Sequence, residues 1–77
     1  MPRYFFSTAN GHCVQDEEGD ILPDDEAARS LAVDILSEIL PSQRDQLRQG
    51  GQYSIFVAAE DRTAIYEITA TARRIGN

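Results

Sequence analysis

The stretch DDEAARSLAVDILSEIL, residues 24–40, decides the fold class of this chain. Its apolar side chains recur at steps of three and four residues, which places them on one stripe of a helix of about four turns. They are Ala28, Leu31, Ala32, Ile35, Leu36, Ile39 and Leu40. Asp24 is the expected N-cap, and Pro41 is expected to end the helix. An apolar stripe of this kind is typical of a helix that packs on a core.

The last third of the sequence alternates with period two and predicts a β-hairpin. Residues 53–57 and 63–72 are the two expected strands, and residues 59–62 are the expected turn. The register that gathers six apolar side chains on one face pairs Val57 with Ala64, Ile55 with Tyr66 and Tyr53 with Ile68. It also pairs Phe56 with Ile65 on the opposite face, whereas a slip by one residue would set Ile55 against Glu67.

The aromatic start of the chain predicts a second hairpin. Residues 3–8 are the first expected strand, Asn10-Gly11 favours a two-residue type I′ turn, and residues 12–15 are the returning strand. A two-residue loop pairs Ala9 with His12, Thr8 with Cys13, Ser7 with Val14 and Phe6 with Gln15. This register places Tyr4, Phe6, Thr8 and Cys13 on one face, and Phe5, Ser7 and Val14 on the other.

Together these elements predict one small α+β domain over residues 1–77, in the order β-β-α-β-β, with a four-stranded, mainly antiparallel sheet. One helix covers one face of that sheet. The other face is then expected to expose four apolar side chains, Phe5, Val14, Phe56 and Ile65. An apolar patch of that size suggests a partner, so we expect self-association into a homodimer or binding of another protein there. The alternative is that the polar segment 42–49 folds across this face.

Composition narrows the classes of function. The chain has 77 residues, seven basic and thirteen acidic, and a formal net charge of −6. An acidic protein is a poor ligand for phosphate backbones, so we expect no nucleic-acid partner. The sequence holds no apolar run of the length a membrane span needs, and we expect no membrane partner. A single cysteine cannot form an internal disulfide, which fits a reducing compartment and predicts a cytoplasmic protein.

The acidic segment 16–25 is the second candidate site. Asp16, Glu18 and Asp20 alternate around Gly19 in a manner that suggests calcium ligands, and Asp24 follows. An EF-hand alignment fails, because position 1 falls on Val14 and the position of the bidentate glutamate falls on Asp25. A looser cation or small-ligand site at Asp16, Glu18, Asp20 and Asp24 is the alternative function. The competing interpretation is a solvated turn before the helix.

The sequence gives little support for a catalytic site. His12 and Cys13 are the single members of their types, and adjacent strand residues point to opposite faces. We therefore expect no bound metal and read Cys13 as a small buried side chain. Lysine is absent, which excludes a P-loop lysine and a Schiff base. The expected function is that of a non-catalytic module without a cofactor.

The opening MPRYFF, residues 1–6, and the motif D-x-E-G-x-x-L-P-D, residues 16–24, resemble a family of small uncharacterised bacterial domains. Members of that family typically open with MPRYFFH and carry the acidic motif before an alanine-rich helix. The resemblance covers nearly the whole chain and implies the same order of elements. This chain departs from the family pattern at Ser7, where members commonly have histidine, and lacks the usual glycine in its final turn. The resemblance implies no activity.

Overall fold

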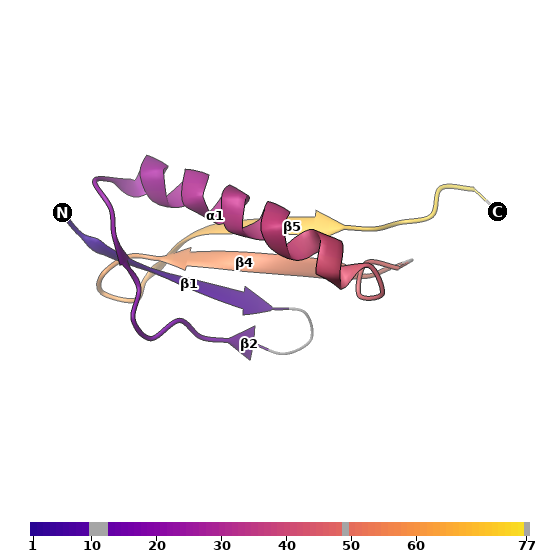
Figure 1. Ribbon diagram of the computed structural model, residues 1–77, viewed down its shortest axis with the longest axis horizontal. Coiled ribbons are helices and arrows are strands. Elements are labelled where there is room, and N and C mark those ends of the chain that lie inside the picture. Colours follow the sequence, from indigo (N-terminus) through magenta and orange to yellow (C-terminus); the bar gives the residue numbers. More distant parts are fainter. Residues whose placement is uncertain (10–12, 49, 77) are drawn as a thin grey trace.

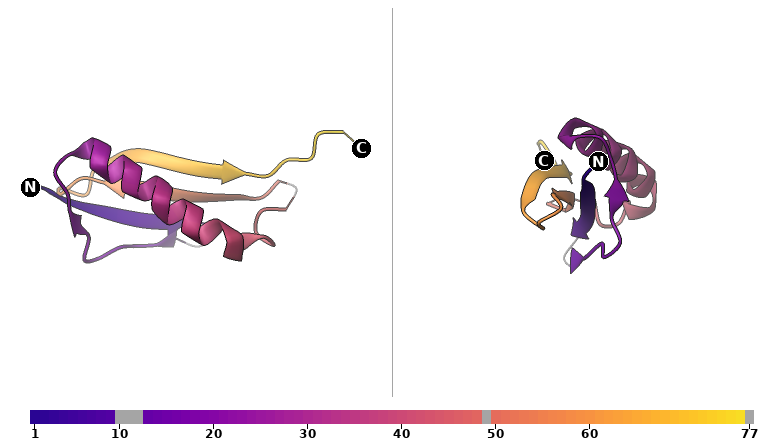
Figure 2. Two further views of the ribbon diagram at one scale, coloured as in Figure 1. Left: turned by 45° about the horizontal axis from the view of Figure 1, so that its top comes forward. Right: turned by 90° about the vertical axis from the view of Figure 1, so that its left-hand side faces the viewer.

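The computed structural model describes residues 1–9, 13–48 and 50–76. It contains one α-helix, α1 (Asp25–Ile39), a short 3-10 helix, η1 (Leu40–Gln43), and five strands. The strands are β1 (Arg3–Ala9), β2 (Cys13–Val14), β3 (Asp20–Ile21), β4 (Gln52–Ala58) and β5 (Ala64–Thr71). The helix lies along one face of the sheet, and the opposite face has no helix over it (Figures 1 and 2). This is the predicted α+β arrangement.

The sheet is antiparallel with the strand order β2-β1-β4-β5. Strand β3 also pairs with β1, so that β2 and β3 lie along the same edge of β1, one after the other. The first and last thirds of the chain thus meet in the middle of the sheet, where β1 pairs with β4 from Phe5↔Ala58 to Ala9↔Ser54. The sequence pattern predicted neither this order nor β3.

The predicted register of the first hairpin is wrong. Thr8 pairs with Val14 and Ala9 with Cys13, so three residues separate the strands where two were expected. The predicted Asn10-Gly11 turn and His12 lie outside the described residues. Strand β2 is also shorter than expected, because the Phe6 N–H donates to the Asp16 carboxylate at 3.1 Å and not to Gln15. A side chain has replaced the backbone partner, and the ladder ends after Val14.

The second hairpin has the predicted faces in a different register. Ile55 pairs with Ile68, Val57 with Tyr66 and Tyr53 with Ala70, a shift of two residues from the predicted pairing. Phe56 accordingly faces Glu67 and not Ile65. A shift of two preserves the side of the sheet on which each residue lies. The ladder is then irregular at Val57/Ala58, because Ala58 pairs with Ala64 and leaves Ile65 as the extra residue of a β-bulge.

The helix begins and ends close to the predicted residues. Asp24 is the N-cap, and its carboxylate accepts a hydrogen bond from the Ala27 N–H at 2.8 Å. Pro41 lies in η1, directly after α1. The buried core joins the helix stripe to the strands and consists of Tyr4, Phe6, Ala28, Ala32, Leu36, Tyr53, Ile55 and Val57. Of segment 42–49 the structure describes residues 42–48, and these do not cross the sheet as the alternative required, since Leu47 packs against this same core.

Candidate functional site

The sheet face without the helix is more polar than the sequence predicted. Ser54 lies there nearly buried, and its hydroxyl is 2.9 Å from that of Thr69. Ser7 and Thr71 occupy the same face, as the cross-strand pairs show. Apolar surface on this face is therefore concentrated around Phe56, which is half-buried between Ser7 of β1 and Glu67 of β5.

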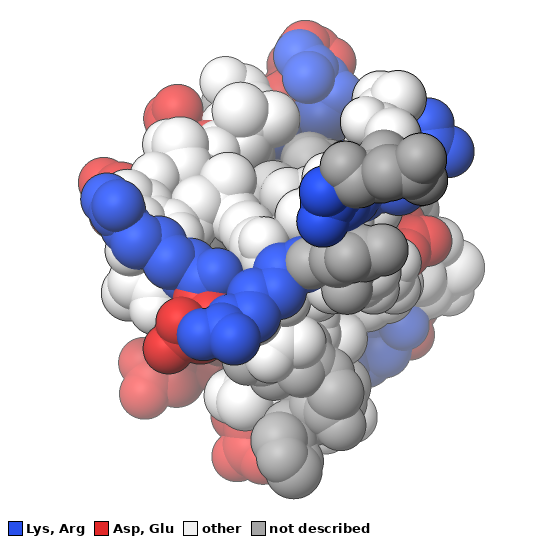
Figure 3. Space-filling model, turned by 90° about the vertical axis from the view of Figure 1, so that its right-hand side faces the viewer, with Lys and Arg blue, Asp and Glu red and all other residues white. Residues whose placement is uncertain are grey.

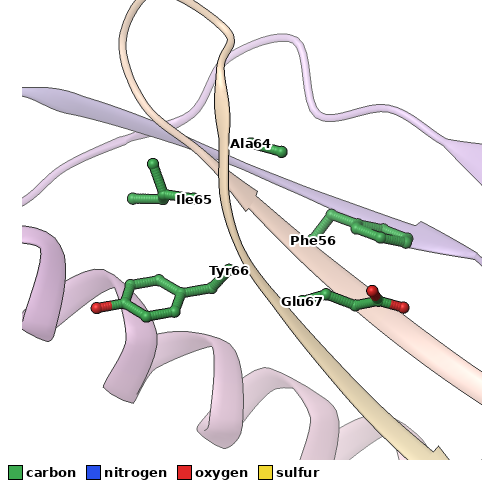
Figure 4. Close-up of a pocket in the computed structure, with 5 residues that line it drawn as sticks. All are labelled: Phe56, Ala64, Ile65, Tyr66 and Glu67. Carbon is green, nitrogen blue, oxygen red and sulfur yellow. The ribbon is translucent and has the colours of Figure 1, made fainter.

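Beside Phe56 the surface is hollowed. The hollow has a volume of about 270 Å³ and is lined by Phe56, Ala64, Ile65, Tyr66 and Glu67, which we call the Phe56 surface. Figure 4 shows Phe56 and Glu67 on one side of β5, and Ile65 and Tyr66 on the side of the helix. The hollow thus lies at the bulge of the edge strand β5, beside Phe56 of the neighbouring strand β4.

The four residues predicted to share an open apolar face do not come together. Val14 pairs with Thr8 and so lies on the helix side of the sheet, where it is 64% exposed at the far edge. Ile65 is the bulge residue, and it packs against the core. Phe5 and Phe56 remain on the face without the helix. Of the predicted interface, Phe56 and Ile65 line the hollow.

Phe5 is only 7% exposed because another side chain covers it. The Arg62 guanidinium carbon lies 3.7 Å from the centroid of the Phe5 ring, a cation–π contact. Arg62 Nη1 also donates to the Asp16 carbonyl oxygen at 3.1 Å. Arg62 therefore joins the β4–β5 turn to the acidic segment across Phe5, and no pattern in the sequence indicated this contact.

The acidic segment 16–20 is held against β1 by its own first residue. The Asp16 carboxylate accepts hydrogen bonds from the N–H groups of Gly19 at 3.0 Å, Phe6 at 3.1 Å and Glu18 at 3.2 Å. Burial opposes ionisation of Asp16, but these three donors and Arg62 prevail, and the pKa of the carboxyl lies below its usual value. The oxygens that a cation would need are already engaged by the backbone.

The remaining predicted cation ligands are dispersed. Asp24 caps the helix, while Glu18 and Asp20 are exposed on the segment that precedes it. Asp25 accepts a hydrogen bond of 2.7 Å from the Tyr4 hydroxyl, which together with burial raises the pKa of Tyr4 to about 12. Within residues 1–9, 13–48 and 50–76 no three carboxylate, imidazole or thiol groups lie close enough to hold a metal ion. His12 and the Cys13 side chain fall outside the described part of the structure.

Charge is distributed unequally along the length of the molecule. The connection from β2 to α1 and the β4–β5 turn lie at one end, which carries the acidic residues 16–26 together with Glu60 and Asp61. The other end carries Arg44, Arg48, Arg73 and Arg74, together with Asp45, whose carboxylate forms an ion pair of 3.2 Å with Arg48. Arginine side chains spread over this end in Figure 3. Hydrogen bonds of 2.9 and 3.0 Å between Ala72 and the glycines at 50 and 51 hold the two arginine-bearing segments next to each other.

The sequence pattern did not predict the hollow, because the hollow depends on a single irregularity in β5. The hollow depends on the bulge, which breaks the two-residue alternation at Ile65 and turns that side chain towards the helix. A signal was present in the run Ala64-Ile65-Tyr66, where apolar residues follow one another without alternating. Such a run in an otherwise alternating strand is compatible with a bulge.

Comparison with known proteins identifies the family and no closer relative. Neither the curated proteins nor the solved structures gave a match. In the described segments no helix combines the length and apolar character needed to cross a membrane. The model of one protein family, described as a domain of unknown function (DUF6894), matches residues 3–71, from the first residue of β1 to the last of β5. The chain belongs to the DUF6894 family.

Proposed function

We propose that this protein is a non-catalytic interaction module that self-associates through the Phe56 surface. The observation that carries the proposal is the hollow beside Phe56, at the one edge of the described sheet that presents a long strand without a neighbour. Phe56 and Ile65 supply apolar contact area, and Glu67 supplies a polar boundary. A partially buried aromatic side chain beside a hollow is a common anchor in protein interfaces.

A second copy of the chain is the partner that the charges favour. Two molecules with a net charge of −6 repel one another in most orientations. In an antiparallel pair, however, the acidic end of each copy lies next to the partner's Arg73 and Arg74, which follow β5. Charge complementarity of this kind selects a partner and an orientation more than it adds affinity. The single cysteine fits the reducing cytoplasm, where we place this assembly.

Molar mass by light scattering, over a hundredfold range of concentration, tests the proposal. We expect a dimer of twice 8.6 kDa for the unchanged protein and a monomer for Phe56→Asp, because the charge would enter an apolar contact. Val33→Asp is the matched control, since Val33 is 43% exposed and lies on α1, away from the hollow. Circular dichroism must show that both variants are folded.

Two results would contradict the proposal. One is an unchanged protein that remains monomeric at the highest concentration. The other is a folded Phe56→Asp variant that dimerises as well as Val33→Asp does.

A further inference from the structure

Strand β5 is the last strand of the described sheet and is built regularly after its bulge. It runs from Ala64 to Thr71, next to β4 on one side. Residues 66–71, YEITAT, contain no lysine, arginine, proline or glycine, and Glu67 is their single charge. Edge strands of monomeric proteins are usually protected against pairing with another chain by lysine or other charges, by proline or by bulges. In β5 such protection is limited to the bulge at Ile65 and the charge of Glu67, and residues 68–71 carry none of it.

We propose that β5 pairs antiparallel with β5 of a second copy, centred on Ile68, so that the two sheets become continuous. This proposal rests on the self-association proposed above and assigns its geometry. Pairing of edge strands is an established mode of protein association, in which main-chain hydrogen bonds supply affinity and side chains set the register. A two-fold axis closes such an assembly at two copies.

Side chains select the register centred on Ile68. There Tyr66 faces Ala70 of the partner subunit, a large side chain against a small one, and Ile68 faces its own counterpart. Glu67 faces the neutral side chain of the partner's Thr69, whose hydroxyl donates to Glu67 of its own subunit at 3.2 Å. The neighbouring register centred on Glu67 would set two carboxylates directly opposite each other, which is unfavourable. A register centred on Tyr66 would place the bulge residue Ile65 next to the two-fold axis, whereas the register centred on Ile68 keeps it outside a ladder of residues 66–70.

The charges that flank β5 agree with the antiparallel direction. Glu60, Asp61 and Arg62 precede the strand, and Arg73 and Arg74 follow it. The Arg62 guanidinium is turned away onto the Phe5 ring and the Asp16 carbonyl oxygen, which leaves the two carboxylates as the charges at this end of β5. In an antiparallel pair the two arginines of one copy come close to the two carboxylates of the other, once at each end of the paired strands. A parallel pair would instead place like charges together at both ends. Opposite charges at the rim of an interface mainly fix orientation and raise the association rate.

The same symmetry places both helices on one face of the joined sheet. An axis perpendicular to the sheet leaves the helix side of each copy facing the same way. Tyr66 and Ile68 are only half-buried by the helix of their own subunit. The neighbouring subunit would cover the remainder of these side chains, while the hollow at the bulge would lie at each end of the paired segment.

Amide hydrogen exchange of residues 66–70, measured by NMR above the dimerisation midpoint, tests the pairing. In a free edge strand every second N–H points to solvent and exchanges rapidly, whereas in a paired strand all are protected. The Phe56→Asp monomer provides the reference pattern. We expect alternating protection in that variant and continuous protection in the unchanged dimer.

Each outcome decides between the two proposals. Continuous protection in a dimer supports the pairing of β5. A dimer that retains alternating protection overturns the pairing and leaves self-association through the Phe56 surface in place. A protein that is monomeric at every concentration overturns both.

A charge reversal provides an independent test of direction. We expect Arg73→Glu combined with Arg74→Glu to raise the dimer dissociation constant roughly tenfold at low salt, and less at high salt. Arg44→Glu combined with Arg48→Glu is the control, because it changes the net charge by the same amount. These two arginines belong to the segment that leads into β4, and so lie away from the free edge of β5. Equal effects of the two double variants would overturn the antiparallel arrangement.

Discussion

The two edges of the sheet end in different ways. At the β1 edge, β2 and β3 each contribute two residues, and the Asp16 carboxylate takes the Phe6 N–H between them. At the other edge, β5 is eight residues long and ends the described sheet. One edge is closed by a folded segment of the same chain, and the other is available for pairing. The comparison indicates that the acidic segment, which resembles a ligand site in sequence, completes the fold.

This difference assigns separate effects to substitutions at the two edges. A change at the closed edge should lower the free energy of unfolding and leave the association constant of the folded protein unchanged. A change at the open edge should weaken association of the folded protein and leave the free energy of unfolding of the monomer unchanged. Three substitutions at the closed edge test the first half of this statement, in order of decreasing expected effect.

Gly19→Ala should cause the largest loss of stability. Gly19 has a φ of +72°, and a Cβ atom there would lie 2.5 Å from the Tyr4 carbonyl oxygen and 3.0 Å from a ring carbon of Phe5. The strained backbone and the clash with β1 together should lower the free energy of unfolding by about 3 kcal/mol, as measured in urea.

Gly50→Ala separates the two causes of that loss. Gly50 has a φ of +82°, but nothing lies within 4 Å of the position of its Cβ atom. We expect it to lose only the backbone contribution, about 1 kcal/mol. Equal losses for the two variants would show that the acidic segment is not packed tightly against β1.

Asp16→Asn should have an intermediate effect. One carboxylate oxygen accepts from Gly19 and Glu18, and the other accepts from Phe6. An asparagine amide has one oxygen, so one N–H group in one orientation, and two in the other, must face an NH₂ group. The free energy of unfolding should fall by about 1–2 kcal/mol. Asp20→Asn is the control, since the Asp20 side chain is exposed on β3.

The pH dependence of stability, compared between the unchanged protein and Asp16→Asn, gives the sign of the Asp16 contribution. Folding lowers the pKa of Asp16 from its ordinary value of 3.8, so its contribution to stability is complete above that pH. It is lost as the pH falls through the lower pKa of the folded state. Thermal unfolding at several pH values should show that the unchanged protein is more stable than Asp16→Asn by a constant amount near neutrality. This difference in stability should shrink below pH 3.8. A difference that grows in acid would contradict the assignment.

Regular elements could be predicted from the sequence because their signals are periodic. The helix boundaries follow from an N-capping aspartate and a proline, and the faces of β4 and β5 follow from alternation. The register of β4 with β5 could not be predicted, because registers that differ by two residues bury the same faces. The bulge at Ile65 decided between them.

The candidate sites were harder to predict because side chains there take the place of backbone groups as hydrogen-bond partners. The Asp16 carboxylate acts as a strand partner for Phe6, which ended β2 early. The separation of β1 and β2 by three residues instead of two placed Val14 on the helix side of the sheet. Arg62 covers Phe5 from a turn more than fifty residues away in sequence. Contacts of this kind depend on the order of strands in the sheet, and periodicity carries no information about that order.

Arg62→Ala should cause the smallest loss of stability. It also gives the sharpest test of the difference between the two edges of the sheet. Arg62 has a φ of +72°, which alanine must also adopt, so the backbone strain is unchanged. The lost groups are the cation–π contact with Phe5 and the hydrogen bond to the Asp16 carbonyl oxygen. At this exposed site we expect a decrease of about 0.5–1 kcal/mol in the free energy of unfolding.

The dimer dissociation constant of Arg62→Ala then decides how far the interface extends. Removal of the guanidinium uncovers Phe5, which lies on the same face as Phe56 but on β1, two strands away from β5. If association occurs at the β5 edge, the newly exposed ring lies outside the contact, and at high salt, where the lost charge of Arg62 is screened, the dissociation constant stays the same. Tighter association would mean that the interface crosses the whole sheet face, and that Arg62 limits it.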